Sequence, residues 1–115
     1  MGYRKRNNAV VDKTFEFACQ IVFLSDKLKE NKDYELASQL LRAGTSIGAN
    51  TRESQRGSST KDFANKLKIA LKEAEEVEFW LDVLDVTRDY KIENYYKQLD
   101  EIIRLLVSII KSTNS

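Results

Sequence analysis

The chain has no proline and only four glycines among its 115 residues, so little in it interrupts a helix. Its apolar residues recur at intervals of three and four, which is the spacing of one helix face. This spacing marks four segments, over about residues 9–31, 34–56, 60–88 and 92–112. The sequence therefore predicts an all-α chain with four helices and no strands.

The segments that join the expected helices are only a few residues long. Short connections place consecutive helices side by side and antiparallel. We therefore expect one domain, residues 1–115, folded as an up-down-up-down antiparallel four-helix bundle, with residues 1–8 as a flexible basic tail and residues 113–115 as a frayed end. The first helix has a main apolar row, Val10, Thr14, Phe17, Ile21, Leu24 and Leu28, and beside it a second row, Val11, Phe15, Ala18 and Val22.

Small residues are concentrated in the second expected helix, where Gly44 and Gly48 stand four residues apart. Glycine in a helix interior costs up to ~1 kcal/mol relative to alanine, so two of them need a structural reason. Residues four apart lie on one helix face, and without side chains that face lets another backbone approach closely. We expect a neighbouring helix to pack closely against both glycines.

The fourth expected helix carries more apolar residues than one bundle core requires. Its main row is flanked by a second row and two further apolar residues, namely Tyr96, Ile103, Ile110, Leu105 and Val107. Either this helix is deeply buried within a small bundle, or its extra face packs on another subunit. Large exposed apolar patches are uncommon on monomers, which favours the second alternative and predicts a homo-oligomer.

Histidine is absent from the chain. It therefore lacks the usual acid–base catalyst, the base of Ser–His and Cys–His pairs and the commonest zinc ligand. Glu73, Glu75, Glu76 and Glu78 are close in sequence, but a di-iron site in a bundle also needs two Glu-x-x-His pairs. We expect no enzyme activity, no catalytic residue, no metal site, no cofactor and no small-molecule substrate.

Cys19 is the single cysteine and cannot form an internal disulfide, which suits the reducing cytoplasm, where we expect the protein to be located. Cys19 stands beside Ala18 in an apolar part of the first helix, where we expect it to pack in the core rather than to react. No stretch approaches the ~18 consecutive apolar residues of a membrane span, and we expect no membrane partner.

The net charge of +1 hides a segregation of charge along the chain. Residues 42–72 contain seven basic and two acidic residues, a net +5, whereas residues 73–89 contain one basic and seven acidic residues, a net −6. The third helix is therefore basic first and acidic second, the reverse of what its own dipole favours, so we expect a neighbouring helix, another subunit or a polyanion to account for the order. The candidate phosphate contacts are Arg4, Lys5, Arg6, Arg52, Arg56, Lys61, Lys66 and Lys68.

A solvated charged surface explains each of these basic residues at least equally well. No base-reading strand, zinc finger or glycine-rich phosphate loop accompanies them. Nucleic-acid binding through them would therefore be weakly specific and sensitive to salt.

A polar stripe with spacings of three and four runs along the second helix and consists of Gln39, Arg42, Ser46, Asn50 and Glu53. Part of it is expected near packed surface, where a buried Arg42 needs a carboxylate partner, and Glu76 of the third helix is the candidate. The stripe is interpreted as a polar network that fixes helix register, with a ligand or nucleic-acid site as the less favoured alternative.

Residues 36–84 resemble a known family. The family is the four-helix bundle family named after the 23S rRNA intervening-sequence protein. The resemblance is carried by three stretches of this chain, LASQLLRAGTSIGANTRESQRG, STKDF and IALKEAEEVEFWL. They are similar to two motifs of that family, L-x-x-Q-x-x-R-A-x-x-S-I-x-x-N-x-x-E-G and I-A-x-x-E-A-x-E-x-x-x-W-L. The matching positions are Leu36, Gln39, Arg42, Ala43, Ser46, Ile47, Asn50, Glu53, Ile69, Ala70, Glu73, Ala74, Glu76, Trp80 and Leu81. The pattern differs after Glu53, where the glycine is delayed to Gly57.

The resemblance implies a four-helix bundle of a bacterial-type family that assembles as a ring, typically a homopentamer. Some members are encoded within insertions in ribosomal RNA genes. A related accessory protein of diversity-generating retroelements binds a reverse transcriptase and nucleic acid. No biochemical activity is established for most members.

Helix pattern, charge and resemblance together predict a non-enzymatic homo-oligomeric helical scaffold. We expect it to bind nucleic acid, either RNA or DNA, or a nucleic-acid-associated protein through a basic surface. The alternative is a protein-only adaptor whose segregated charges serve contacts between subunits. Both alternatives place another copy of the chain among its partners.

Overall fold

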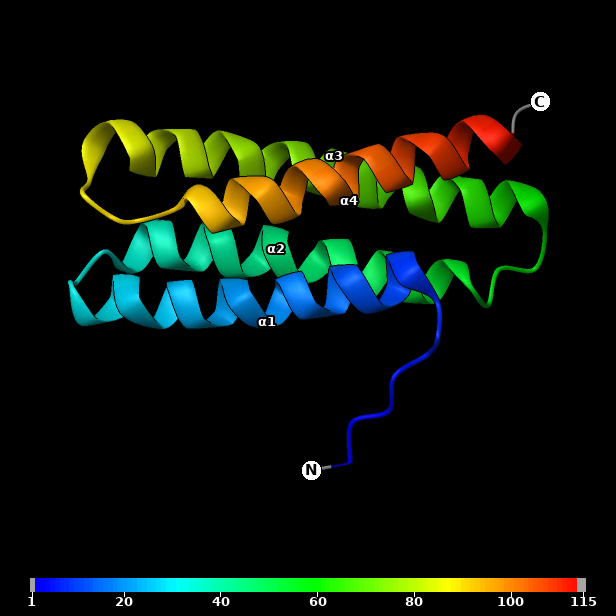
Figure 1. The fold of residues 1–115 in the computed structure, drawn as a ribbon, viewed down its shortest axis with the longest axis horizontal. Helices are drawn as coiled ribbons and strands as arrows, with labels where there is room; N and C mark the ends of the chain where they lie inside the picture. The colour runs from blue at the N-terminus through cyan, green and yellow to red at the C-terminus, as the bar shows by residue number, and fades with distance from the viewer. Residues whose placement is uncertain (1, 114–115) are drawn as a thin grey trace.

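A computed structural model describes residues 2–113 of the chain, and in this range it contains four α-helices and no strand. The helices are α1 (Ala9–Glu30), α2 (Tyr34–Ser54), α3 (Thr60–Thr87) and α4 (Glu93–Thr113) (Figure 1). The four predicted helices are confirmed, and their ends differ from the predicted ones by at most two residues. Residue 1 of the predicted tail and residues 114–115 of the predicted frayed end lie outside the described residues.

The helices form two adjacent pairs. α1 lies beside α2 and α3 beside α4, the contacts of α2 with α1 and with α3 are the most extensive, and α4 also contacts α1 (Figure 1). The colours in Figure 1 run in opposite directions along consecutive helices. The structure confirms the predicted all-α fold with four helices packed as a bundle. None of the helices within residues 2–113 has an apolar stretch of the length that a membrane crossing needs.

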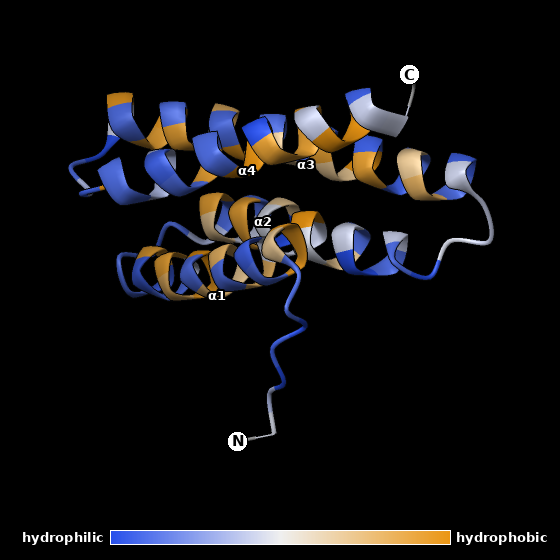
Figure 2. Cartoon of the chain, turned by 45° about the vertical axis from the view of Figure 1, so that its right-hand side comes forward, coloured by the Kyte–Doolittle hydropathy of each residue, from blue (hydrophilic) through white to orange (hydrophobic). Residues whose placement is uncertain are grey.

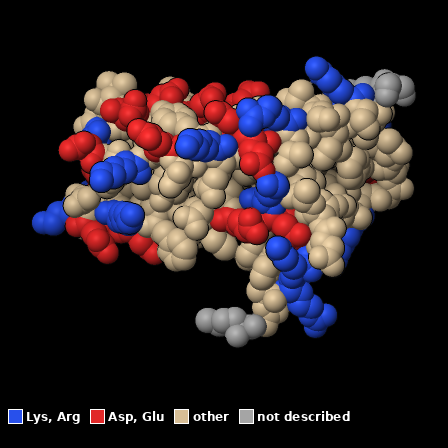
Figure 3. Space-filling model, in the orientation of Figure 1, with Lys and Arg blue, Asp and Glu red and all other residues tan. Residues whose placement is uncertain are grey.

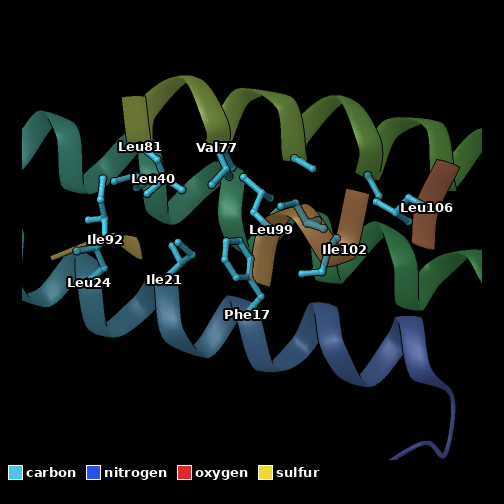
Figure 4. Packing of buried hydrophobic residues seen from close by; sticks show 14 of the residues in the cluster. Phe17, Ile21, Leu24, Leu40, Val77, Leu81, Ile92, Leu99, Ile102 and Leu106 are labelled. Carbon is cyan, nitrogen blue, oxygen red and sulfur yellow. The ribbon is translucent and has the colours of Figure 1, made fainter. Parts of the chain in front are cut away.

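The core lies between the two helix pairs, where the hydrophobic sides of the ribbons meet (Figure 2). It is built from apolar residues of all four helices and includes the predicted main row of α1, because residues spaced by three and four return to the same inward side (Figure 4). The largest side chains that are fully buried are Phe17, Ile21, Leu24, Leu28, Leu40, Ile47, Leu67, Leu81, Leu84, Leu99, Ile102 and Leu106.

The second apolar row predicted for α1 is mostly outside the core. Val11 is buried, but Phe15 is half-buried and Val22 is exposed, because this side of α1 turns away from its neighbours. Of the flanking residues of α4, Ile110 is buried in the core, and Tyr96, Ile103, Leu105 and Val107 are half-buried rather than exposed. Within the described helices, the large apolar side chains with the greatest exposure lie on α1, α2 and α3: Val22, Phe23, Tyr34, Ile69, Phe79 and Val86.

The glycines of α2 mark a close approach of α1. A Cβ atom at Gly44 would lie 2.6 Å from Cγ2 of Ile21, and a Cβ at Gly48 would lie 3.1 Å from the carbonyl oxygen of Thr14. Carbon atoms are in optimal contact at about 3.5–4.0 Å, so no side chain fits at Gly44 unless α1 moves. The predicted close packing against both glycines is confirmed.

Asp33 joins the two loops at one end of the bundle. Its carboxylate accepts hydrogen bonds from Nη2 of Arg88 at 2.9 Å and from the hydroxyl of Tyr90 at 3.2 Å. The same hydroxyl accepts a hydrogen bond from the side-chain amide of Asn31 at 2.7 Å. The Arg88 guanidinium holds the pKa of the Asp33 carboxyl below its usual range. These contacts connect the α1–α2 loop with the α3–α4 connection.

Replacing Gly44 with alanine is expected to destabilise the fold by about 1–2 kcal/mol, because the clash with Ile21 outweighs the gain in helix propensity. The change can be measured by urea unfolding. In an Ile21→Ala background the same substitution should cost about 1 kcal/mol less, since the two closest clashing atoms, Cγ1 and Cγ2 of Ile21, are gone and only its Cβ remains at 2.9 Å. A stabilising effect of Gly44→Ala in the wild-type background would contradict the close approach.

Replacing Asp33 with asparagine is expected to lower the free energy of unfolding at neutral pH and to have little effect in acid. A carboxyl whose pKa is lowered by folding stabilises the protein above its ordinary pKa of 3.8, and the contribution is lost as the pH falls through the lowered value. Urea titrations of both proteins across this range give the difference directly. A difference that stays constant from neutral pH into acid would show that Asp33 does not act through its charge.

Candidate nucleic-acid interface

Asp12 holds the N-terminal segment, residues 2–8, against α1. The residue is 7% exposed, and its carboxylate accepts hydrogen bonds from the backbone N–H groups of Arg6 at 3.0 Å and Asn8 at 3.2 Å. The hydroxyl of Tyr3 donates a third bond at 3.4 Å. The bond from the Arg6 N–H is the main reason why the pKa of Asp12 lies below its usual range. These bonds connect Tyr3, Arg6 and Asn8 to the first turn of α1, from whose start the segment runs away from the four helices (Figure 1).

Aromatic rings and guanidinium groups stack beside this segment. The rings of Tyr3 and Phe15 are parallel to within 7°, and their centroids are 4.3 Å apart. Arg52 of α2 lies over the Phe15 ring, with Cζ 5.3 Å from its centroid, and Arg6 lies over the Tyr3 ring at 5.8 Å. Both distances fall within the ~6 Å range of cation–π attraction. The two rings therefore hold two guanidinium groups on one surface.

Two adjoining hollows open beside the stacked rings, with volumes of about 610 and 460 Å³. The larger one is lined partly by small residues of α1 and α2, namely Ala18, Thr45, Gly48 and Ala49. The basic residues that line one or both hollows, here called the basic cluster, are Arg4, Lys5, Arg6, Arg52 and Arg56. Figure 3 shows Lys and Arg side chains gathered around the N-terminal segment below α1.

Arg52 has a hydrogen-bond donor that nothing in the described chain satisfies. Its Nη2 atom is buried and has no partner within residues 2–113, although the side chain as a whole is partly exposed. An unsatisfied buried donor costs about 1–3 kcal/mol, so this nitrogen needs an acceptor from outside the chain. A phosphate oxygen suits it, since guanidinium groups form strong paired hydrogen bonds with phosphate.

The three lysines predicted as phosphate contacts on α3 do not belong to the basic cluster. Lys66 lies 3.7 Å from Oε1 of Glu53 and lines a separate hollow together with Arg56. Lys61 and Lys68 are exposed on α3. Of the eight predicted phosphate contacts, five line the two adjoining hollows and three lie on α3.

Arg42 makes the ion pair that the sequence predicts, but it is not buried. Its guanidinium contacts Glu76 and lies 3.2 Å from Oε2 of Glu73, and Nε1 of Trp80 donates to the same Glu76 carboxylate at 3.3 Å. The Arg42 side chain is 52% exposed. The small residues of α2 face α1, which leaves the polar stripe at the outer edge of the contact between α2 and α3. The expectation of a buried Arg42 is therefore wrong.

The other members of the predicted polar network are not joined to Arg42. The side-chain amide of Asn50 donates to the carbonyl and hydroxyl oxygens of Ser46 at 2.9 and 3.1 Å, one turn earlier in α2. Glu53 pairs with Lys66, and Gln39 is exposed beside Trp80. The stripe thus joins α2 to α3 at two separate places, where Arg42 meets Glu73 and Glu76 and where Glu53 meets Lys66, instead of forming one continuous network.

Three residues of this site are not identified from the sequence: Tyr3, Asp12 and Phe15. The apolar spacing assigns Phe15 to a core row, although its ring forms the outer surface on which Tyr3 and Arg52 pack. The sequence does contain a signal for Tyr3, which stands directly before a run of three basic residues. It also contains a signal for Asp12, which is a lone acidic residue among apolar residues at the start of a helix.

The acidic residues and the cysteine are dispersed. Within residues 2–113 no group of three or more His, Cys, Asp or Glu side chains is arranged to hold a metal ion. Glu73 and Glu76 bind Arg42, whereas Glu75 and Glu78 are exposed. Cys19 is a half-buried free thiol, so the prediction that it packs in the core is wrong, because it lies on the side of α1 that turns outward.

The chain matches a protein family over most of its length. The model of the family described as "23S rRNA-intervening sequence protein" matches residues 6–111. The chain belongs to this family. The resemblance of residues 36–84 is thereby confirmed, and the match includes Arg6, Arg52 and Arg56 of the basic cluster.

A protein of the S23 ribosomal protein family, whose structure has been solved, has the same fold. It is the crystal structure of a protein of unknown function from the S23 ribosomal protein family of Bacteroides thetaiotaomicron VPI-5482. It superposes with a TM-score of 0.84 and 49% sequence identity, and the match covers 89% of this chain and 98% of that chain. A comparison with curated proteins finds no match. These similarities establish the family and the fold.

Replacing Asp12 with alanine is expected to release the N-terminal segment, because the acceptor of the Arg6 and Asn8 N–H groups is removed. Hydrogen exchange of these two amides should become faster by roughly tenfold or more, and trypsin should cleave the segment faster at its basic residues. The matched control is Asp26→Ala, an exposed acid elsewhere on α1. Unchanged exchange at Arg6 and Asn8 would contradict the role given to Asp12.

Proposed function

We propose that this chain is a cytoplasmic, non-enzymatic scaffold that assembles with copies of itself and binds nucleic acid through the basic cluster. The observation that carries the proposal is the convergence of five basic residues around the stacked rings of Tyr3 and Phe15. Three of these residues come from the N-terminal segment, Arg52 lies in the last turn of α2 and Arg56 just after it, so the fold brings together charges that are far apart in the sequence.

The chemistry of the basic cluster suits a single nucleic-acid strand. Single strands bind where positive charge follows the backbone and where aromatic rings and arginines offer faces for stacking. Tyr3 is 46% exposed, so part of its surface is open to a base. Arg52 supplies the unsatisfied donor for a phosphate oxygen. Nothing in this arrangement reads base edges, and the proposed binding is therefore weakly specific for sequence and accepts RNA or DNA.

The proposed self-assembly rests on apolar surface that a single copy leaves uncovered. Four of the five flanking residues of α4, all except Ile110, are only half-buried, and Phe79 and Val86 of α3 are exposed. Surfaces of this kind are typical of contacts between subunits. The family resemblance implies a ring of five copies. The absence of histidine and the dispersed carboxylates support a scaffold rather than an enzyme, with no cofactor or metal.

A second candidate function is a protein-only adaptor, and the segregated charge of α3 favours it. The first half of this helix is basic and the second half acidic, and within residues 2–113 only Lys66, Glu73 and Glu76 among these charges form ion pairs with α2. In this alternative the charges serve contacts between protein subunits, and nucleic acid is not bound. The two functions are separated by the following experiment.

The double variant Arg52→Ala/Arg56→Ala is expected to weaken binding of a labelled single-stranded RNA, measured by fluorescence anisotropy between ~50 and ~200 mM salt. Each lost phosphate contact lowers the slope of log affinity against log salt by about 0.7, so the slope should fall by about 1.4. The matched control is Lys27→Ala/Lys29→Ala at the far end of α1, which removes the same charge away from the basic cluster.

Two results would contradict the proposed binding. Absence of detectable RNA or DNA binding by the wild-type protein at ~50 mM salt would leave the adaptor as the better proposal. Equal losses in the two double variants would show that the binding reflects total charge and not the basic cluster.

A further inference from the structure

The larger of the two adjoining hollows has the size of a small-molecule site. Its volume of about 610 Å³ lies within the ~300–1,000 Å³ range of ligand pockets in proteins. Ala18 of α1 and Gly48 and Ala49 of α2 line it and leave space that longer side chains would fill. Phe15 adds an aromatic ring to the same lining. A nucleobase with its sugar suits a hollow of this size and lining.

Positive charge is concentrated at the same hollow. Three arginines line it, Arg6, Arg52 and Arg56, and Glu53 is the one acid among the described lining residues, so the charge of the lining is +2. Arg6 and Arg52 also line the smaller hollow, to which the other two members of the basic cluster add their charges. The two hollows together therefore suit an anion with more than one negative charge.

Contacts within the chain hold Arg6 and Arg52 in place. Nη1 of Arg6 donates a hydrogen bond to the carbonyl oxygen of Arg4 at 2.6 Å, and the same guanidinium lies over the Tyr3 ring. Arg52 lies over the Phe15 ring and retains its unsatisfied Nη2 donor. Groups that are already ordered lose less conformational freedom when a ligand binds, which strengthens the binding.

We propose that the two adjoining hollows bind a nucleotide with a terminal phosphate group, with its nucleoside in the larger hollow and its phosphate at Arg52. A terminal phosphate carries a charge of about −1.5 to −2 at pH 7 and has three acceptor oxygens. A phosphate within a strand carries a single charge and therefore matches the +2 lining less well. The inference rests on the proposed nucleic-acid binding and names its ligand as the phosphorylated end of a strand, of which a free mononucleotide is the smallest form.

Fluorescence anisotropy with short, internally labelled RNAs of one sequence tests the preference for a terminal phosphate. Strands with a phosphate at the 5′ end, at the 3′ end or at neither end are compared with a longer hydroxyl-ended strand of equal charge. At least one phosphorylated strand should bind roughly tenfold more tightly than both hydroxyl-ended strands, because it gains charge-assisted hydrogen bonds at Arg52. Equal affinities for all of these strands would overturn the proposal.

The pH dependence separates the terminal phosphate from the side chains of the site. A terminal phosphate takes up a proton near about pH 6, so its negative charge falls between pH 7 and ~5.5. The titratable side chains that line the hollows are the basic cluster, Glu53 and Tyr3, residue types that ordinarily titrate outside this range, and the chain has no histidine. The preference for the phosphorylated strand should therefore weaken as the pH is lowered, whereas the hydroxyl-ended strands should bind equally well throughout. A preference that does not change with pH would overturn the proposal.

The variant Arg52→Lys tests where the phosphate binds. Lysine keeps the positive charge but lacks the paired donors of the guanidinium group. The variant should lose the preference for the phosphorylated strand and retain the salt dependence of hydroxyl-ended strands. The matched control is Arg104→Lys, at an exposed arginine of α4, which should keep the preference. Circular dichroism and urea midpoints confirm that both variants are folded, and a preference that survives in Arg52→Lys would overturn the placement of the phosphate.

The variant Ala49→Leu tests where the nucleoside binds, because it puts a larger side chain in the lining of the larger hollow and changes no charge. Isothermal titration calorimetry should show weaker binding of uridine monophosphate and unchanged binding of inorganic phosphate. Ser38→Leu, at an exposed position elsewhere on α2, is the matched control and should bind both as the wild type does. Unchanged binding of uridine monophosphate by Ala49→Leu would overturn the placement of the nucleoside.

The outcomes distinguish this inference from the proposed nucleic-acid binding. A wild-type protein that binds neither RNA nor uridine monophosphate at ~50 mM salt overturns both. Equal binding of phosphorylated and hydroxyl-ended strands overturns this inference and leaves the proposed function standing. Binding of uridine monophosphate but of no RNA supports the site, with a free nucleotide as its ligand, and overturns the nucleic-acid function.

Discussion

The close approach of α1 and α2 is the constraint on which the rest of the structure depends. Gly44 leaves the space that the Ile21 side chain occupies, and Gly48 lets the α1 backbone come near at Thr14. The two helices then share one core with α3 and α4. The same absence of side chains also leaves a hollow at the surface, because Gly48 and its small neighbours do not fill the space beside Phe15. The glycines of α2 therefore contribute both to the packing of α1 on α2 and to the hollow of the candidate nucleic-acid interface.

Two aspartates organise the parts of the chain that helix packing does not determine. Asp33 joins the loops at one end of the bundle through Arg88 and Tyr90. Asp12 fixes the N-terminal segment by accepting two backbone N–H groups, which places Arg6 near Arg52. Folding lowers the pKa of both carboxyls, so each contributes stability in its charged form. Asp12 therefore positions the part of the basic cluster that belongs to the N-terminal segment.

The near-zero net charge of the chain results from basic and acidic regions that lie apart on the structure and have different roles. The basic cluster lies where the N-terminal segment meets the end of α2, whereas the acidic residues follow the second half of α3. The proposed nucleic-acid binding and the proposed self-assembly use different surfaces, so a nucleic-acid strand and a second copy of the chain do not compete for the same residues. Family membership and the 49% identical structure establish the fold on which these surfaces are arranged.

The sequence by itself determined the four helices, the main core row of α1, the close packing at Gly44 and Gly48 and the partner of Arg42. These depend on spacing along one helix or on a charge that needs a counter-charge, and both are visible in the order of residues. Only the tertiary structure decided that Arg42 is exposed and that Phe15 faces outward under Tyr3 and Arg52. The physical reason is that a period of 3.6 shows which residues share a face, but the neighbouring helices decide which of several apolar faces is covered.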